Sequence, residues 1–246
     1  MLTNNERRDY EFMIDSVYSA ATMKNELSLS KWCDRTRQTL QAVKVLKDDL
    51  QARYDADKAR YSNAENDRRW KETQDEKKAF EDVARARIDK DLDRVIDAKR
   101  SAFSKAMSAP DEASVRLLQT LQMRQNVTAS EIAATVPHLA GNLQALSVLS
   151  EIASRNGVLF PKLETDFLTV ESKLRESAKS LLDSVFSEEP TYFAHLFIKD
   201  STHNGTLRPF VDQLDNPAYL QVDVTAIKDA KNPDADNGDN DNEPAV

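Results

Sequence analysis

Cysteine, glycine and long apolar runs are scarce in this chain of 246 residues. Cys33 is the single cysteine, which excludes a disulfide scaffold and fits a reducing compartment. No run approaches the roughly 18 consecutive apolar residues of a membrane-spanning helix, so we expect no membrane segment. Aromatic residues make up 7% of the chain and hydrophobic residues 40%, against 31% charged residues. This composition permits a sizeable core only if the core is shared along a seam between elements.

Helix-breaking residues are absent from the first 109 positions, because all four glycines and all eight prolines lie at or after Pro110. Proline costs about 3 kcal/mol inside a helix, and glycine nearly 1 kcal/mol relative to alanine. Their absence predicts a helical N-terminal region. A capping box at Thr3–Glu6 predicts a first short helix. Asn25–Ser30 is a plausible break, and a second helix is expected from about Ser30 to about Ser108.

Two apolar stripes run along the long predicted helix, with a highly charged stretch at residues 55–79 between them. Their sustained spacing of three and four residues is typical of a coiled-coil seam. We expect the seam to bury apolar surface through self-association, and a hairpin within one chain is the alternative. The residues expected to carry the association are Leu40, Val43, Leu46, Leu50, Phe80, Ile88, Leu92, Val95 and Phe103.

The second half of the chain has shorter apolar periods separated by proline and glycine. The spacing predicts a small helical bundle over residues 110–189, with a capping box at Thr128–Glu131 and a final helix that starts at Pro161. Residues 190–228 are expected to form a short irregular or mixed segment. Residues 229–246 are rich in acidic side chains and are expected to be a disordered tail. The predicted fold class is therefore all-α: a long helix or coiled-coil hairpin over residues 1–109, a small bundle, a short mixed segment and the acidic tail.

Charge is divided unevenly along the chain. Residues 1–109 carry 23 basic and 21 acidic side chains, and the remainder carries 11 and 21, which gives the overall net charge of -8. The doubled basic residues of the long helix, such as Lys77-Lys78, each have acidic residues within one turn. A nucleic-acid-binding protein usually shows a basic stripe. The sequence therefore gives little support for a nucleic-acid partner, and we expect no membrane partner.

The sequence shows no recognisable catalytic or metal-binding pattern. The glycines are isolated, so no phosphate-binding loop is expected. Cys33 with His138, His195 and His203 does not make a zinc set of the usual spacing. The acidic tail lacks the glycine and glutamate positions of an EF-hand loop. We therefore expect no enzyme activity, no cofactor and no metal.

Three segments carry a family resemblance, namely Leu117–Arg124, Gly141–Leu146 and Glu151–Gly157. They resemble small helical proteins encoded among tailed-phage structural genes, and the long charged helix resembles phage scaffolding proteins. The resemblance implies a non-enzymatic role in virion assembly, with the chain itself and another structural protein as partners. Scaffolding proteins commonly grip the coat protein with a basic C-terminal helix, whereas this C-terminus is acidic, which puts a coat-gripping tail in doubt.

Two other functions stay open on the sequence. The first is an intracellular adaptor or inhibitor that binds a protein partner as a monomer, with the long helix folded back on residues 110–190. The second is a nucleic-acid-associated helical protein. The first eight residues have no apolar stretch after a basic start, so we expect no signal peptide. The expected location is the cytoplasm, which is the host cytoplasm for a phage protein, or the virion.

Overall fold

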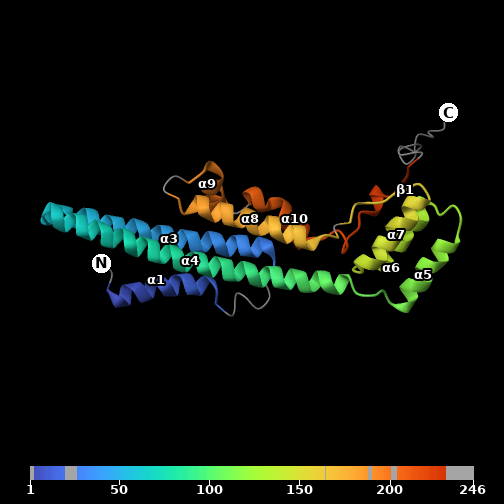
Figure 1. Ribbon diagram of the computed structural model, residues 1–246, viewed down its shortest axis with the longest axis horizontal. Coiled ribbons are helices and arrows are strands. Elements are labelled where there is room, and N and C mark those ends of the chain that lie inside the picture. The colour runs from blue at the N-terminus through green and yellow to red at the C-terminus, as the bar shows by residue number, and fades with distance from the viewer. Residues whose placement is uncertain (1–2, 20–26, 164, 188–189, 201–203, 231–246) are drawn as a thin grey trace, which may run out of the picture. The chain divides into compact units, whose positions relative to one another are not determined.

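The computed structural model describes residues 3–19, 27–163, 165–187, 190–200 and 204–230 (Figure 1). These residues form nine α-helices, three short 3-10 helices and two strands of two residues each. The predicted all-α fold class is confirmed. The chain divides into two compact units: unit 1 comprises Met1–Lys99 and Leu168–Asp215, and unit 2 comprises Arg100–Phe167 and Asn216–Val246.

Unit 1 is built on a helical hairpin of α3 (Leu29–Asp57) and α4 (Asn63–Ala106, of which the last turns belong to unit 2). The indole nitrogen of Trp32 donates to the backbone carbonyl of Ile88 at 3.1 Å. Near the other end, the Lys77 ammonium donates to the Gln51 side chain at 2.7 Å. Partner positions rise along α3 as they fall along α4, so the two helices are antiparallel.

The turn of the hairpin corrects the expectation of one continuous helix from Ser30 to Ser108. The chain leaves α3 through the 3-10 helix η1 (Lys58–Arg60) and re-enters a helix at Asn63. The hydroxyl of Ser62 accepts from the Glu65 amide at 3.4 Å. The buried Asn66 side chain donates to the carbonyl oxygens of Lys58 and Tyr61 at 2.9 and 3.3 Å. Side-chain hydrogen bonds therefore satisfy the backbone groups that the break in the helix leaves unpaired.

Three C-terminal helices complete the core of unit 1: α8 (Phe167–Val185, with Phe167 in unit 2), α9 (Tyr192–Lys199) and α10 (Arg208–Asp215, after the 3-10 helix η2 at Gly205–Leu207). Arg175 pairs with Asp93 at 2.6 Å, and Arg85 pairs with Asp183, so α8 is antiparallel to α4. Apolar residues from α3, α4, α8, α9, η2 and α10 share one core, whose largest member is Trp32.

Helix α1 (Asn4–Val17) packs against another part of the hairpin. Its capping box between Thr3 and Glu6 is confirmed. Ile14 is buried in a second cluster with residues of α3 and α4, whereas the flanking Phe12 is exposed. The Tyr10 hydroxyl donates to the Asp49 carboxylate at 2.9 Å. This helix thus covers Val43, Leu46, Leu50, Phe80 and Ala84 with one amphipathic face.

Unit 2 is a small bundle of α5 (Glu112–Met123), α6 (Ala129–Leu139) and α7 (Leu143–Arg155). The capping box at Thr128 and Glu131 is confirmed. Strand β1 (Val158–Leu159) pairs antiparallel with β2 (Lys228–Asp229), which follows the 3-10 helix η3 (Val224–Ala226). Asp229 therefore belongs to a strand, and residues 231–246 of the predicted acidic tail lie outside the described residues.

The two units differ from the predicted boundaries at residues 109 and 189. The expected final helix of the bundle is α8, which starts at Phe167 rather than at Pro161. Its apolar residues Leu174, Ala178 and Leu182 pack into the core of unit 1 rather than against α5–α7. Periodicity indicates which face of α8 is buried, but it does not indicate which helices cover that face. Within the described residues, no helix is long and apolar enough to span a membrane.

Candidate protein-docking site

The structure brings eight of the nine residues expected to carry self-association into the interior of one chain. Each is at most 4% exposed. Leu40, Ile88, Leu92 and Val95 lie in the core shared with α8, and Val43, Leu46, Leu50 and Phe80 lie in the cluster under α1. The seam is therefore filled by the helices of the same chain. In this arrangement the eight side chains are buried within one chain rather than against a second copy.

Phe103, the ninth residue, lies in unit 2. It is half-buried, and its ring centroid is 5.3 Å from that of Phe167 and 6.4 Å from that of Tyr219. It is thus separate from the other eight, because the last turns of α4 belong to the other compact unit.

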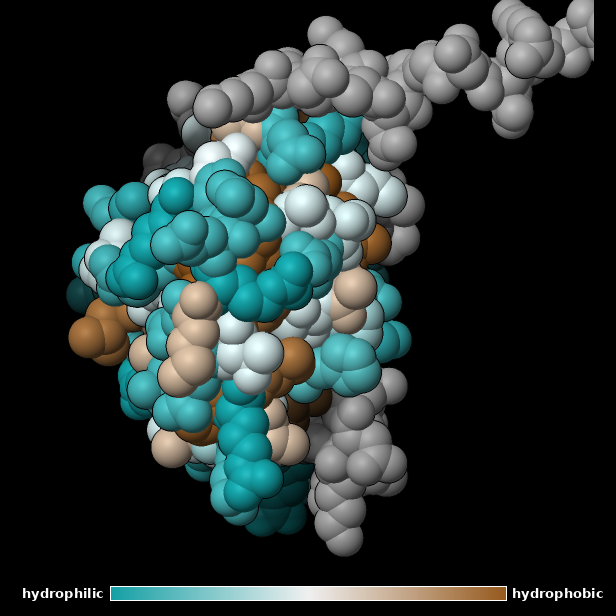
Figure 2. Space-filling model, turned by 90° about the vertical axis from the view of Figure 1, so that its right-hand side faces the viewer, coloured by the Kyte–Doolittle hydropathy of each residue, from teal (hydrophilic) through white to brown (hydrophobic). Residues whose placement is uncertain are grey.

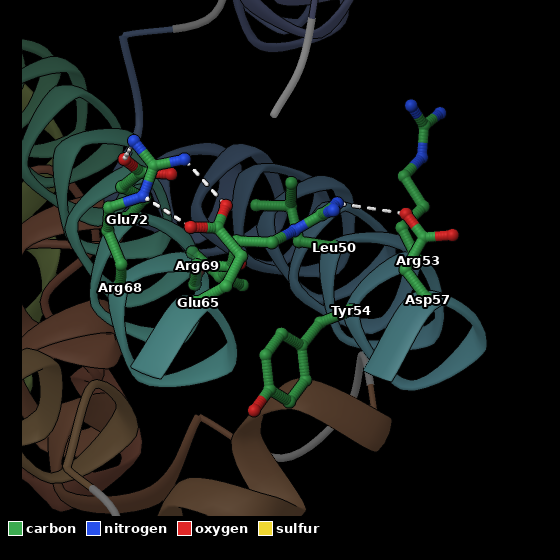
Figure 3. Close-up of a pocket in the computed structure, with 9 residues that line it drawn as sticks. Leu50, Arg53, Tyr54, Asp57, Glu65, Arg68, Arg69 and Glu72 are labelled. Carbon is green, nitrogen blue, oxygen red and sulfur yellow. Dashed lines mark hydrogen bonds and ion pairs between the residues drawn. The ribbon is translucent and has the colours of Figure 1, made fainter. Parts of the chain in front are cut away.

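The tip of the hairpin contains a cavity of about 380 Å³ that is lined by alternating arginines and carboxylates (Figure 3). Arg68 donates to Glu65 at 2.6 Å, and Arg69 donates to Asp57 at 2.9 Å. Arg53 is paired with Glu6 of α1 at 2.7 Å. Each arginine at the cavity is neutralised by a carboxylate, so the cavity attracts neither anionic nor cationic ligands.

A second region of unit 1, between the hairpin and the C-terminal end of α8, has a different character. Two cavities of about 410 and 300 Å³ share Lys47, Phe186 and Ser187 in their linings. We call them together the docking groove. Its described lining consists of Leu40, Val43, Lys44, Lys47, Asp48, Gln74, Lys77, Lys78, Glu81, Asp82, Arg85, Val185, Phe186, Ser187, Pro190, His195, Ile198 and Lys199.

The apolar floor of the docking groove lies in the smaller cavity, and of its members only Phe186 also lines the larger one. Leu40 and Val43 are buried, and Val185, Phe186 and Ile198 are half-buried. The Phe186 ring lies where the two cavities meet, and the Arg85 guanidinium is 5.8 Å from its centroid. A half-buried aromatic ring between two cavities is the kind of anchor on which a partner side chain can pack.

The rim of the docking groove is basic. Lys47 is paired with Glu81, and Arg85 is paired with Asp183. Lys44 and Lys78 are exposed and make no ion pair within the described residues. Burial, with repulsion from Lys47 as a smaller cause, lowers the pKa of Lys77. The groove thus gathers positive charge in a chain whose net charge is -8.

The groove residues are not recognisable from the sequence as a site. Lys77-Lys78 is visible as a doubled basic pair, but Glu81 and Asp82 lie within one turn of it and argue for a neutral face. The fold adds Lys44 and Lys47 from α3 and Phe186 from the end of α8. No spacing rule connects these three segments.

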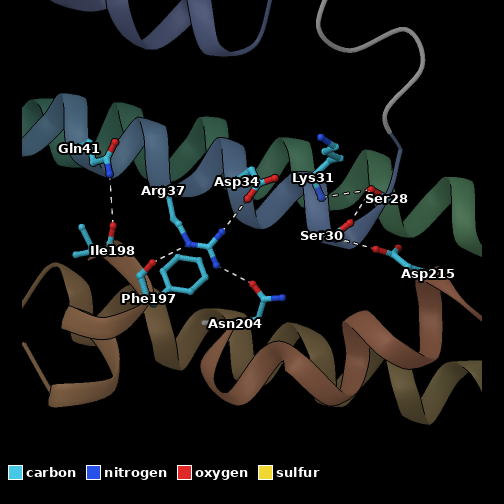
Figure 4. A network of polar contacts seen from close by, with 10 residues as sticks. All are labelled: Ser28, Ser30, Lys31, Asp34, Arg37, Gln41, Phe197, Ile198, Asn204 and Asp215. Carbon is cyan, nitrogen blue, oxygen red and sulfur yellow. Dashed lines mark hydrogen bonds and ion pairs between the residues drawn. The ribbon is translucent and has the colours of Figure 1, made fainter. Parts of the chain in front are cut away.

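Helix α9 forms one wall of the groove, and a buried arginine of α3 fixes its position (Figure 4). The Arg37 guanidinium donates to the Phe197 carbonyl at 2.8 Å, to Asn204 at 2.7 Å and to Asp34 at 2.9 Å. It also lies 4.6 Å from the centroid of the Phe197 ring. Several charge-assisted bonds from one planar group restrict both the distance and the angle of α9 relative to α3.

Asp215 at the end of α10 closes the same side of unit 1 (Figure 4). Its carboxylate accepts from the amides of Leu29 and Ser30, each at 2.8 Å, at the first turn of α3. Lys99 lies 3.0 Å away. Burial alone would raise the pKa of Asp215, but the two amide bonds and the Lys99 charge outweigh it and hold the pKa below its ordinary value.

Buried polar groups of unit 1 serve packing in this structure. Arg35 and Asp91 form a buried ion pair at 2.7 Å between α3 and α4. Burial raises the pKa of the Cys33 thiol to about 12, so it is a poor nucleophile at neutral pH. Burial likewise raises the pKa of Tyr18 to about 12. Within the described part of the chain, no group of His, Cys, Asp and Glu side chains could hold a metal ion.

Figure 2 shows one face of the molecule, on which hydrophobic residues appear in separate small areas among hydrophilic ones. Exposed large apolar residues of unit 2 include Met123 and Leu159. Scattered apolar side chains of this kind are normal on a protein surface and are not by themselves evidence of a binding site.

Comparison with protein-family models, curated proteins and solved structures found no match to this chain. The docking groove is therefore the feature of the molecule from which a function is inferred.

Proposed function

We propose that the chain is a non-enzymatic helical docking protein that acts as a monomer and binds a segment of a partner protein in the docking groove. The observation that carries this proposal is the groove itself, which combines an apolar floor around Phe186 with a rim of lysines. Apolar anchors surrounded by a polar rim are the usual anatomy of a protein interface.

The internal burial of the seam supports the monomeric form of this proposal. The hairpin, α1 and α8 bury Leu46 and Leu92 without a second copy. Hydrophobic burial is the main driving force of association, and here that surface is already removed from water. A role in virion assembly remains compatible with the proposal, and the partner is then another structural protein of the particle.

Site-specific photo-crosslinking in the cells that express the protein tests the proposal. A benzoylphenylalanine placed at Lys44 or at Lys78 reports on the groove, and one placed at the exposed Lys90 of α4 is the matched control. We expect a discrete adduct with one protein from the two groove positions and none from Lys90. The adduct from Lys44 should disappear when Phe186→Ala is added.

Two outcomes contradict the proposal. The first is an adduct pattern at Lys90 that equals the pattern at the groove positions. The second is an adduct whose only component is a second copy of this chain.

A further inference from the structure

We infer that the partner segment in the docking groove is an acidic amphipathic helix that packs its apolar side chains on Phe186 and places its carboxylates beside the lysines. The inference rests on the proposed function and names the chemistry of the partner, which the proposed function leaves open.

The charge of the groove supports an acidic partner. Its described lining contains six basic residues against three acidic ones, Asp48, Glu81 and Asp82. The rest of the chain has the opposite balance, because the total net charge is -8. A basic region on an acidic protein attracts an acidic segment and selects against basic ones. Lys44, Lys78 and Lys199 are exposed and make no ion pair within the described residues, so they can contact partner carboxylates.

The floor of the groove supports apolar side chains on the same segment. The two cavities, about 410 and 300 Å³, are within the range of pockets that hold ligands. The aliphatic stems of lysines can add apolar surface while their ammonium groups stay in water. A segment with only carboxylates would leave Phe186, Val185 and Ile198 without a partner.

The path of α8 supports a helical segment. The ion pairs of α8 with α4 extend from Asp93 to Arg85, and the first half of α4, residues 63–84, continues beyond the end of α8 (Figure 1). At 1.5 Å per residue, the 19 residues of α8 span roughly 28 Å and the 44 residues of α4 roughly 66 Å. The groove lies where α8 ends. A partner helix placed there would pack on the part of the hairpin beyond the end of α8, as α8 itself packs on the preceding part.

The same residues argue against a nucleic acid. Phosphate recognition favours the planar fork of arginine, and the one arginine that lines the groove, Arg85, is paired with Asp183. Asp48, Glu81 and Asp82 are interspersed among the lysines, so the groove lacks the continuous basic stripe that a phosphate backbone would follow. Glu188 and Glu189 follow Ser187 in the sequence and lie outside the described residues, so they are not counted in the charge of the groove.

Fluorescence anisotropy with the full-length protein tests the inference. The probe is a labelled peptide of about 18 residues with leucines at spacings of three and four and glutamates at the other positions. We expect saturable binding that weakens with added salt. Lys44→Glu with Lys78→Glu should raise the dissociation constant at least about tenfold, because four units of charge change at the rim. The matched control, Lys90→Glu with Lys179→Glu, makes the same change on exposed lysines elsewhere and should leave the constant within about twofold.

Further probes separate the requirement for acidic side chains on the bound segment from the requirement for apolar ones. A peptide of residues 229–246 is acidic and has no large apolar side chain except Val246, so it should bind at least about tenfold more weakly than the leucine peptide. Phe186→Ala should weaken the leucine peptide, with circular dichroism confirming that the variant is folded.

Several outcomes overturn the inference. Equal binding of the leucine peptide and the 229–246 peptide would show that the groove recognises charge alone. Tighter binding of an 18-nucleotide single-stranded DNA, sensitive to the Lys44 and Lys78 changes, would identify a nucleic-acid site. No peptide binding, together with a groove-specific cross-linked partner, would refute the acidic-helix chemistry and leave the proposed function standing. Loss of the cross-link refutes the proposed function itself.

Discussion

At the residue scale, Asp215 joins two ends of unit 1 that are far apart in the chain. Its carboxylate occupies the first turn of α3, where exposed amides and the helix dipole favour negative charge. Lys99 of α4 provides a third contact. One side chain of α10 thereby connects α3, α4 and α10, and its charge is part of the connection.

The lowered pKa of Asp215 gives a signed pH dependence. In the unfolded chain the carboxyl titrates near its ordinary value of 3.8, and in the folded state its pKa is lower. The carboxylate therefore stabilises the fold fully above about pH 5, and this contribution is lost as the pH falls below 3.8. We expect Asp215→Asn to lower the free energy of unfolding by about 1 kcal/mol at pH 7, because the variant loses the negative charge that the first turn of α3 and Lys99 stabilise. The difference from the wild type should shrink below pH 4, as measured by urea denaturation across the pH range.

Asp111→Asn is the matched control for this measurement. Asp111 caps the exposed start of α5 by accepting from the Ser114 amide at 2.7 Å. Asparagine caps a helix about as well as aspartate, so the free energy of unfolding should change by less than about 0.5 kcal/mol. A larger effect for Asp111→Asn than for Asp215→Asn would show that the buried contacts of Asp215 contribute little.

Such contacts could not be predicted from the sequence. Arg37 and Phe197 are 160 positions apart, and Leu29 and Asp215 are 186 apart. An arginine on a charged helix indicates a solvated face unless the packing around it is known. Local signals behave differently, because a helix cap and its partner lie within three residues. The capping boxes at Thr3 and Thr128 could therefore be predicted and are confirmed.

At the scale of elements, the hairpin turn determines whether α3 and α4 are one rod or two packed helices. The sequence Ser62-Asn63-Ala64-Glu65 has the spacing of a capping box, so a start signal for α4 is present in the sequence. The stop signal of α3 is missing, because no glycine or proline lies between Asp57 and Asn63. The turn depends on Asn66, which bonds to carbonyls on the other side of the break.

Asn66→Ala should therefore weaken the tip of the hairpin. The substitution leaves the Lys58 and Tyr61 carbonyls without their side-chain donor, and we expect a loss of about 1–2 kcal/mol in the free energy of unfolding. Amide hydrogen exchange should increase near residues 58–66. Asn63→Ala, at an exposed position three residues earlier, should have an effect below about 0.5 kcal/mol. Equal exchange rates in the two variants would refute a structural role for the Asn66 bonds.

At the scale of the whole molecule, the spacing of the apolar stripes indicates a buried helix face but does not indicate what covers that face. Spacings of three and four indicate which face of a helix is buried. Eight of the stripe residues are at most 4% exposed within one chain, and Phe103 is half-buried. The same spacings are satisfied equally by a second chain or by α1, α4 and α8 of the same chain. The docking groove cannot be predicted from the sequence for a related reason, since it exists only where four separate segments, α3, α4, the end of α8 and α9, meet.

The double variant Leu46→Asp with Leu92→Asp distinguishes the two ways of filling the seam. Each leucine is at most 4% exposed within one chain, and a buried unpaired carboxylate costs several kcal/mol. We expect the wild type to sediment at its monomer mass of 27.8 kDa over a wide concentration range. The double variant should keep that mass and lose helical circular dichroism. Val45→Asp, on the same helix at a side chain that is 55% exposed, should change neither. A wild type that sediments as an oligomer, and a double variant that becomes a fully helical monomer, would show that the seam joins two chains.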